Sequence, residues 1–344
     1  MRKRSIPTLL GVICLVLVMA TIATGCQSAS TTPPASAPAP TDGAKTSAAP
    51  AAASSQTYSL KYWLLGAESA WTGAVHKRFM ENVKQKSGGR VVFTPYWNQS
   101  LAPSKESINA LKSGLADFGQ FQTFNNPGEF PVSDLAAVPF LLESPRAVGA
   151  VYAQLYKDGL MPEYEGKGFK VFGFNGTDMQ MLLFKDKQIT SLEQMKGLKI
   201  RSQNAITTEM LTLLGATPVP LPSGDVYMSL ERGVIDGALS SPTYMAPYKF
   251  YEVGKVLLDQ PLFFGNSFWA INQKTWESLP ADLQTILAEC ALEVTDDWQK
   301  EVVKQEQISK GVMRDKGVSF YKLSDAELAR WKQATASMTG KFIK

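Results

Sequence analysis

One arginine stands where the sequence could bind an anion. Arg201 directly follows a short, mostly apolar segment, residues 198–200, which predicts a buried strand that ends at this side chain. A guanidinium presents parallel N–H donors that fit both oxygens of a carboxylate, and it stays charged at any relevant pH. The alternative is a surface ion pair with Glu193 or Glu209, and the residue types alone do not decide between the two.

Three aromatic residues are expected nearest to a bound ligand: Trp97, Trp269 and Tyr244. The two tryptophans lie beside predicted strand ends, and the tyrosine lies in the segment after Ala238, where α/β proteins usually bind ligands. Trp63 and Trp71, near the first predicted strand and helix, are further candidates. Aromatic side chains are also ordinary core residues, so core packing is the alternative for each of them.

Residues typical of catalysis are sparse. The one histidine, His76, falls in a predicted helix, and no G-x-S-x-G elbow accompanies it. The chain has no H-E-x-x-H, no Walker loop and no G-x-G-x-x-G after a strand. Scattered carboxylates leave a paired acid and base open. We expect a binding protein with no catalytic residue, no cofactor and no metal site, and a surface or supporting role for His76.

The segments that would position these residues alternate between strand and helix. Apolar and aromatic runs predict strands at 58–65, 91–93, 170–174, 199–201 and 318–321. Three- and four-residue spacing of apolar side chains predicts helices at 68–86, 104–114, 207–214 and 223–232, and a long one beyond Pro280. The long helix, at about 30 residues and roughly 45 Å, could cross from one domain to another. This order predicts an α/β fold with parallel strand pairing.

The first 25 residues have the pattern of a lipoprotein signal peptide. A positive head, Arg2-Lys3-Arg4, precedes an apolar run at 9–22 that is short for a membrane span. The run ends with Ala-Thr-Gly before Cys26, a pattern similar to a bacterial lipobox, so we expect a lipid on Cys26. An ordinary secretory signal cleaved nearby is the alternative. Both place the mature chain outside the cytoplasm, in the periplasm or on the outer face of the membrane.

Residues 26–56 are expected to form the lipidated end and a disordered tether. Of the 30 residues from 27 to 56, 25 are Ala, Ser, Pro or Thr, and none has a large apolar side chain. Removing residues 1–25 takes three of the 35 basic residues and none of the 31 acidic ones, which leaves a net charge near +1. No basic run suggests nucleic-acid binding. Cys290 is then the single internal cysteine, so neither a disulfide nor a Cys-rich metal site is expected.

Six segments, in order and in register, resemble the solute-binding subunit of TRAP (tripartite ATP-independent periplasmic) transporters. The main one lies within residues 195–240 and contains MKGLKIRS and LLGATPVPLPSGDVYMSLERGVIDGALS. The others are SGGRVVF (87–93), YWNQSLAPSKESINALKSGLADFG (96–119), VPFL (138–141), YEVGKVL (251–257) and WESLPADLQTIL (276–287). The resemblance covers essentially all of residues 58–344.

The resemblance implies two α/β domains of the periplasmic-binding-protein type (type II-like), joined by crossing strands and the long helix, with a ligand cleft between them. We expect one domain from residues 57–178 and 267–306, and the other from 179–266 and 307–344. The implied ligand is a small organic acid. The implied partners are the membrane subunits of a TRAP permease driven by a sodium gradient, so ATP is not needed, and the receptor is expected to be a monomer.

By this resemblance Arg201 matches the family's carboxylate-binding arginine. Asn204 falls where members often place a polar group towards the ligand, although an Asn before a helix commonly caps it. The sequence departs from the family at Gly176-Thr177-Asp178, where many members carry a second arginine. Asp178 could accept hydrogen bonds from ligand hydroxyls or pair with Arg201 in the unliganded protein. A monocarboxylate with hydroxyl, keto or aromatic character is therefore at least as good a candidate as a C4-dicarboxylate.

Three other functional classes are alternatives. The receptor of an ABC transporter would share the fold and the lipobox, and the segment 195–240 is what separates the two families. A sensory lipoprotein would hand its liganded form to a receptor kinase. An extracellular enzyme would turn over a small acid, and the missing nucleophile and base motifs count against it.

Overall fold

The computed structural model describes residues 56–123, 126 and 128–340, all within one compact unit, residues 54–344. The expected signal peptide, Cys26 and the tether up to residue 55 lie outside the described residues. Among the helices of the described part, none combines the length and the apolar character that crossing a membrane requires.

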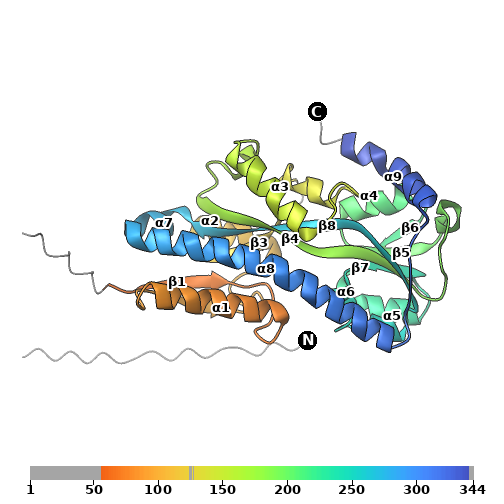
Figure 1. Ribbon diagram of the computed structural model, residues 1–344, viewed down its shortest axis with the longest axis horizontal. Helices are drawn as coiled ribbons and strands as arrows, with labels where there is room; N and C mark the ends of the chain where they lie inside the picture. Colours follow the sequence, from red (N-terminus) through yellow and green to blue (C-terminus); the bar gives the residue numbers. More distant parts are fainter. Residues whose placement is uncertain (1–55, 124–125, 127, 341–344) are drawn as a thin grey trace, which may run out of the picture. The chain divides into compact units, whose positions relative to one another are not determined.

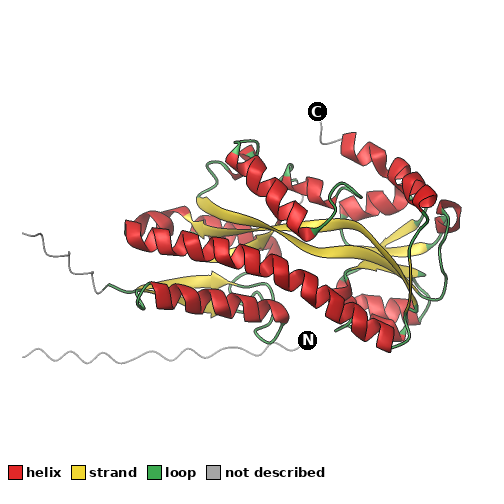
Figure 2. Ribbon diagram, viewed as in Figure 1, coloured by secondary structure: helices red, strands yellow, loops and turns green. Residues whose placement is uncertain are grey.

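The described strands join in one mixed sheet (Figure 2). Its order is β2-β1-β3-β8-β4-β7-β5-β6, and β9 pairs with the first residues of β8. The strands are β1 (Tyr58–Trp63), β2 (Val91–Tyr96), β3 (Phe118–Gln122), β4 (Phe169–Phe184), β5 (Lys199–Ser202), β6 (Thr217–Pro220), β7 (Gly237–Ser240), β8 (Val256–Asn272) and β9 (Ser319–Tyr321). Pairing is parallel for β1 with β2 and β3, and for β5 with β6 and β7, as the βα alternation predicts.

Helices cover the sheet in two groups, which we call the β1 lobe and the β5 lobe (Figure 1). The β1 lobe comprises β1–β3 with α1 (Trp71–Lys86), α2 (Ser107–Ser113) and α3 (Pro145–Lys157). The β5 lobe comprises β5–β7 with α4 (Ala205–Leu213), α5 (Val226–Glu231), α6 (Pro242–Met245) and α9 (Asp325–Gly340). Two hydrophobic clusters pack in each lobe. The domain boundaries expected at 178/179, 266/267 and 306/307 stay a prediction.

Strands β4 and β8 belong to both lobes. They pair antiparallel with each other, and they also pair with β3 on one side and with β7 on the other. Their register shifts at three places: between Val171 and Gly173, between Gly176 and Met179, and between Gln180 and Leu182. The sequence predicted only residues 170–174 as a strand, because Gly173, Gly176 and Asp178 interrupt the β pattern. Pairing with the apolar β8 makes the strand continue to Phe184.

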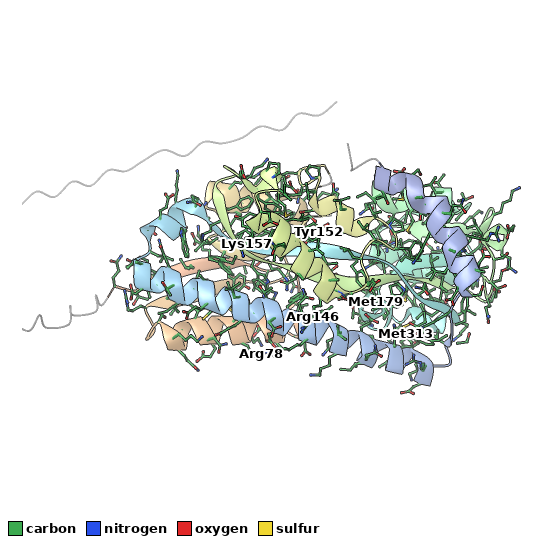
Figure 3. The ribbon with its side chains drawn as sticks, turned by 45° about the horizontal axis from the view of Figure 1, so that its top comes forward. Arg78, Arg146, Tyr152, Lys157, Met179 and Met313 are labelled. Atoms are coloured by element: carbon green, nitrogen blue, oxygen red, sulfur yellow. The ribbon has the colours of Figure 1, made fainter. Side chains whose placement is uncertain are left out.

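The predicted long helix is α8 (Ala281–Asp315), and α7 (Gln273–Ser278) precedes it. Its 35 residues, about 52 Å at 1.5 Å per residue, contact α1 and β4 and also α6, so the helix packs against both lobes. Met313 of α8 lies in a hydrophobic cluster of the β5 lobe, and Met179 of β4 packs against the same cluster (both labelled in Figure 3). The helix thus ties the two lobes together beside the register shifts of β4.

Gly176 is expected to be intolerant of a side chain. An added Cβ would lie 2.3 Å from Pro145 O and 2.4 Å from Pro145 Cα, both backbone atoms. Gly176→Ala should therefore lower the free energy of unfolding by about 1–3 kcal/mol. The matched control is Gly311→Ala in α8, whose Cβ would meet nothing within 4 Å and should raise stability by about 0.5–1 kcal/mol. Urea unfolding midpoints measure both, and an unchanged midpoint for Gly176→Ala would contradict the close approach.

Candidate functional site

Two adjoining cavities lie where the β1 lobe, the β5 lobe and the shared strand β4 meet. Cavity 1 has a volume of about 690 Å³ and cavity 2 about 710 Å³, both within the usual range for small-molecule sites. They share four lining residues: Gln122, Thr177, Asp178 and Tyr244. Cavity 1 extends towards α1 and α8, whereas cavity 2 extends towards β5 and α4. The shared residues make the two cavities one candidate site.

Arg201 lines cavity 2 and is only 4% exposed. The parallel pairing of β5 with β6 and β7 holds its backbone. Its Nε donates to Leu221 O at 2.9 Å, Nη1 to Leu239 O at 2.8 Å, and Nη2 to Ser223 Oγ at 3.1 Å. All three acceptors are neutral, and no carboxylate of the described residues forms an ion pair with it. The surface ion pair that the sequence left open is therefore not what the structure shows.

The Arg201 cation is fixed in place without a compensating charge. A guanidinium has five N–H donors, so the three bonds leave one donor on each terminal nitrogen. Burial lowers the pKa of Arg201 to about 10, which still leaves it protonated at neutral pH. Removing a cation from water is costly unless an anion approaches it. The free donors and the charge together favour an anionic ligand in cavity 2.

Asp178 sits at the register shift of β4 between Gly176 and Met179 and is 9% exposed. Its Oδ2 accepts hydrogen bonds from Ser241 Oγ, at 3.3 Å, and from Thr243 Oγ1. No described residue donates a hydrogen bond to Oδ1. The pairing with Arg201 that the sequence left open does not occur, because the hydroxyls near the start of α6 bind the carboxylate instead. Burial raises the pKa of Asp178, and the two hydroxyl donors partly oppose this shift.

Tyr244 lines both cavities, as expected for a residue near the ligand. Burial raises its pKa; the Asp178 carboxylate adds to the shift and the Arg201 guanidinium opposes it. The phenol is therefore within electrostatic reach of both charges. The sequence signal for Tyr244 was its place after β7, at the carboxyl end of a parallel strand.

Asn204 also lines cavity 2, but its side chain acts as a helix cap. Its Oδ1 accepts a hydrogen bond from Thr207 N at 3.0 Å, and this bond is part of a capping box that opens α4. The capping alternative is thus confirmed. A role in ligand binding stays a prediction.

Trp97 and Trp269, expected nearest to the ligand, are not among the lining residues of either cavity; their place relative to a ligand stays a prediction. Trp269 is fully buried, and its indole N–H donates to Asn175 Oδ1. Trp97 packs near His76, with ring centroids 6.4 Å apart. Both belong to the aromatic core between the sheet, α1 and α8. The further candidates Trp63 and Trp71 do line cavity 1.

His76 is 6% exposed, so it supports the core and does not lie on the surface. Its Nδ1 lies 2.8 Å from Tyr62 Oη, and the side chain borders cavity 1. Burial lowers the pKa of His76 to about 3, so the ring is neutral at physiological pH. Among the described residues, no group of three His, Cys, Asp or Glu side chains could hold a metal ion.

Sequence reasoning missed several polar residues that line the cavities: Gln120, Gln122, Gln180, Gln203, Ser241 and Thr243. Gln203 Nε2 donates to Gln180 Oε1 at 2.6 Å and to Leu239 O at 3.2 Å. Most of them lie in or just after a strand, as Arg201 does. Their position in or just after a strand was the sequence feature that could have identified them as cavity-lining residues.

Comparisons with known proteins show what the chain is similar to. A family model described as bacterial extracellular solute-binding protein, family 7, matches residues 63–344. The 2,3-diketo-L-gulonate-binding periplasmic protein of Escherichia coli is 25% identical, over 74% of this chain and 78% of its own. The C4-dicarboxylate-binding periplasmic protein of Rhodobacter capsulatus is 28% identical over the same shares.

A solved structure shares the fold. The TRAP periplasmic solute binding protein from Chromohalobacter salexigens, with bound D-glucuronate, matches with a TM-score of 0.74 and 22% identity. The match covers 83% of this chain and 94% of that one. It supports the two-domain periplasmic-binding architecture.

The raised pKa of Asp178 predicts a pH-dependent stability. The folded state holds this proton more tightly than the unfolded state, in which an aspartate has a pKa of about 3.9. The free energy of unfolding should therefore fall as the pH rises from about 4 through the folded-state pKa. Asp178→Asn removes this loss, so the variant should gain stability relative to the parent protein between pH 4 and pH 7.

Urea unfolding at a series of pH values measures the difference. The exposed Asp186 provides the matched control, since Asp186→Asn should track the parent protein at every pH. Parallel curves for Asp178→Asn and the parent would show that burial does not shift this pKa.

Proposed function

The chain belongs to family 7 of the bacterial extracellular solute-binding proteins, and from this we propose that cavity 2 holds a small organic acid by its carboxylate. The observation that carries the proposal is Arg201, a buried cation with neutral hydrogen-bond partners and free donors beside a cavity. The named ligands of the relatives above, a diketo sugar acid, a C4-dicarboxylate and a uronate, each carry a carboxylate.

One arginine can supply a large part of the affinity. A hydrogen bond to a charged group contributes about 1.5–3 kcal/mol, and a micromolar complex needs about 8 kcal/mol. Because Arg201 is already fixed by three hydrogen bonds, little side-chain entropy is lost on binding. Contacts with the other cavity residues would supply the rest.

The liganded protein would deliver the acid to the membrane subunits of a TRAP permease. Closure of the two lobes over the ligand would be the signal that the permease recognises. We propose that the protein works as a monomeric receptor and not as an enzyme, since its single histidine is buried and uncharged. We also propose that a lipid on Cys26 holds the receptor to the membrane.

Binding can be tested with a thermal-shift screen of organic acids. An acid at a hundred times its dissociation constant should stabilise the protein by about 2.7 kcal/mol. Arg201→Ala should weaken binding about 10- to 100-fold, equivalent to one charged hydrogen bond. Arg201→Lys keeps the charge but loses the parallel N–H donors of the guanidinium, so its affinity for the acid should lie between those of the parent and Arg201→Ala.

The exposed Arg232 at the end of α5 is the matched control, and Arg232→Ala should bind as the parent does. Melting without ligand shows whether each variant is folded. Acids that bind Arg201→Ala as tightly as the parent would remove Arg201 from the site, and no binding by any acid would overturn the proposed ligand class.

Anchoring can be tested separately in a bacterial host. The parent should fractionate with membranes and incorporate labelled palmitate, because two or more acyl chains anchor a protein stably. Cys26→Ser should lose the label and leave the membrane fraction. Membrane attachment that survives this substitution would contradict lipidation at Cys26.

A further inference from the structure

Arg201 and Asp178 both line cavity 2, and each is bound by neutral partners instead of by the other: Arg201 by Leu221 O, Leu239 O and Ser223 Oγ, and Asp178 by the hydroxyls of Ser241 and Thr243. Each keeps unused hydrogen-bonding capacity within the described residues: a donor on each terminal nitrogen of the guanidinium, and Oδ1 of the carboxylate. Tyr244 is within electrostatic reach of both. A ligand with a carboxylate alone would satisfy Arg201 and bring a second negative charge towards Asp178. Complementarity therefore requires a second, donating group on the ligand.

The surroundings of Asp178 favour a cation over a neutral hydroxyl as that group. Behind it, the buried Lys310 Nζ lies 2.7 Å from Asp259 Oδ1 and 2.7 Å from Glu306 Oε1. One ammonium thus serves two carboxylates. Burial raises the pKa of Glu306, Lys310 opposes the shift, and the Asp178 carboxylate adds to it, so Asp178 is within electrostatic reach of this group. Three acidic groups face one base in this region. His76, which also lines cavity 1, is uncharged and does not reduce the excess of negative charge.

Among the described lining residues, Lys and Arg occur in cavity 2 and not in cavity 1. Cavity 2 is lined by Arg201 and by the exposed Lys105, so the cations gather where the ligand carboxylate would bind. The site is therefore electrostatically dipolar, with Asp178 and Tyr244 at the junction with cavity 1.

Aromatic rings line cavity 1, which Asp178 also lines. Five of them line cavity 1: Trp63, Trp71, Tyr244, Tyr248 and Trp298. Tyr244 and Tyr248 stack with centroids 6.1 Å apart and planes at 12°, and Trp71 lies 5.0 Å from Trp298 between ring centroids. Aromatic faces attract ammonium groups, most strongly where water is excluded. Cavity 1 therefore combines aromatic rings with the Asp178 carboxylate, whose Oδ1 accepts no hydrogen bond from the described residues. This combination is suited to a positively charged nitrogen.

We propose that the ligand is a zwitterion, an acid that also carries a cationic nitrogen. Its carboxylate binds Arg201 in cavity 2, and its nitrogen binds Asp178 Oδ1 beside the rings of cavity 1. This rests on the proposed function and narrows its ligand class from organic acids to amino acids and related ammonium or betaine carboxylates.

The test compares acids in pairs that differ only at the second group. Isothermal titration of the purified protein would use phenylalanine with 3-phenyllactate, leucine with 2-hydroxy-4-methylpentanoate, and 4-aminobutyrate with 4-hydroxybutyrate, together with glycine betaine. The nitrogen-bearing member of at least one pair should bind at least tenfold more tightly than its hydroxy partner. Asp178→Asn should weaken that binding at least tenfold, while Asp186→Asn leaves it unchanged. Asp178→Asn should change hydroxy-acid binding much less.

The outcomes separate this inference from the proposed function. Hydroxy acids that bind as well as their amino partners, with affinity lost in Arg201→Ala but kept in Asp178→Asn, would overturn the zwitterion and leave the carboxylate receptor standing. Amino acids that bind equally well to Asp178→Asn would also overturn the assignment of Asp178. Failure of both series to bind would overturn the proposed function, and the zwitterion with it.

Discussion

The pairing of β4 with β8 is the constraint on which the rest of the structure depends. In the described sheet, β8 pairs with β3 and β4 pairs with β7, so the strands of the β1 lobe and those of the β5 lobe are joined through the β4–β8 ladder. Their ladder is interrupted between Gly176 and Met179, and the interruption leaves Thr177 and Asp178 beside the cavities. A regular ladder would alternate side chains strictly between the two faces. The irregularity is what brings a carboxylate to the site.

The pairing of β5 with its neighbouring strands explains how the charge of Arg201 can be buried and still be available to a ligand. Backbone carbonyls at Leu221 and Leu239 hold the Arg201 guanidinium, and both belong to segments that flank β5. Neutral acceptors orient the cation without neutralising it. The free-energy cost of removing the guanidinium from water is therefore partly incurred on folding. Its charge stays uncompensated and can attract an anionic ligand. Asp178 is held in a similar way by two hydroxyls.

The sequence predicted those helices and strands that follow from the spacing of nearby apolar residues. The spacing of Leu283, Leu287 and Val294 predicted α8, and the apolar residues before Arg201 predicted its place at a strand. Contacts between distant segments were beyond such reasoning. Asp178 meets Thr243, 65 residues away, and Trp269 meets Asn175, 94 residues away. Nothing in the residue types distinguishes Trp269, which packs in the core, from Trp63, which borders a cavity. Face and register are set by the pairing of β8 with β3 for Trp269, and of β1 with β2 and β3 for Trp63.

The uninterrupted course of α8 has a mechanical consequence. A 35-residue helix without a proline resists bending, and its buried side chains interlock with both lobes. We expect it to restrain bending between the two lobes, so that closure over a ligand is directed and not free. We expect the two lobes to move relative to each other by small twists of the β4–β8 ribbon, because its ladder is interrupted there. Because the register shift between Gly176 and Met179 lies at the cavity wall, a bound ligand would contact the part of the β4–β8 ribbon that twists most easily.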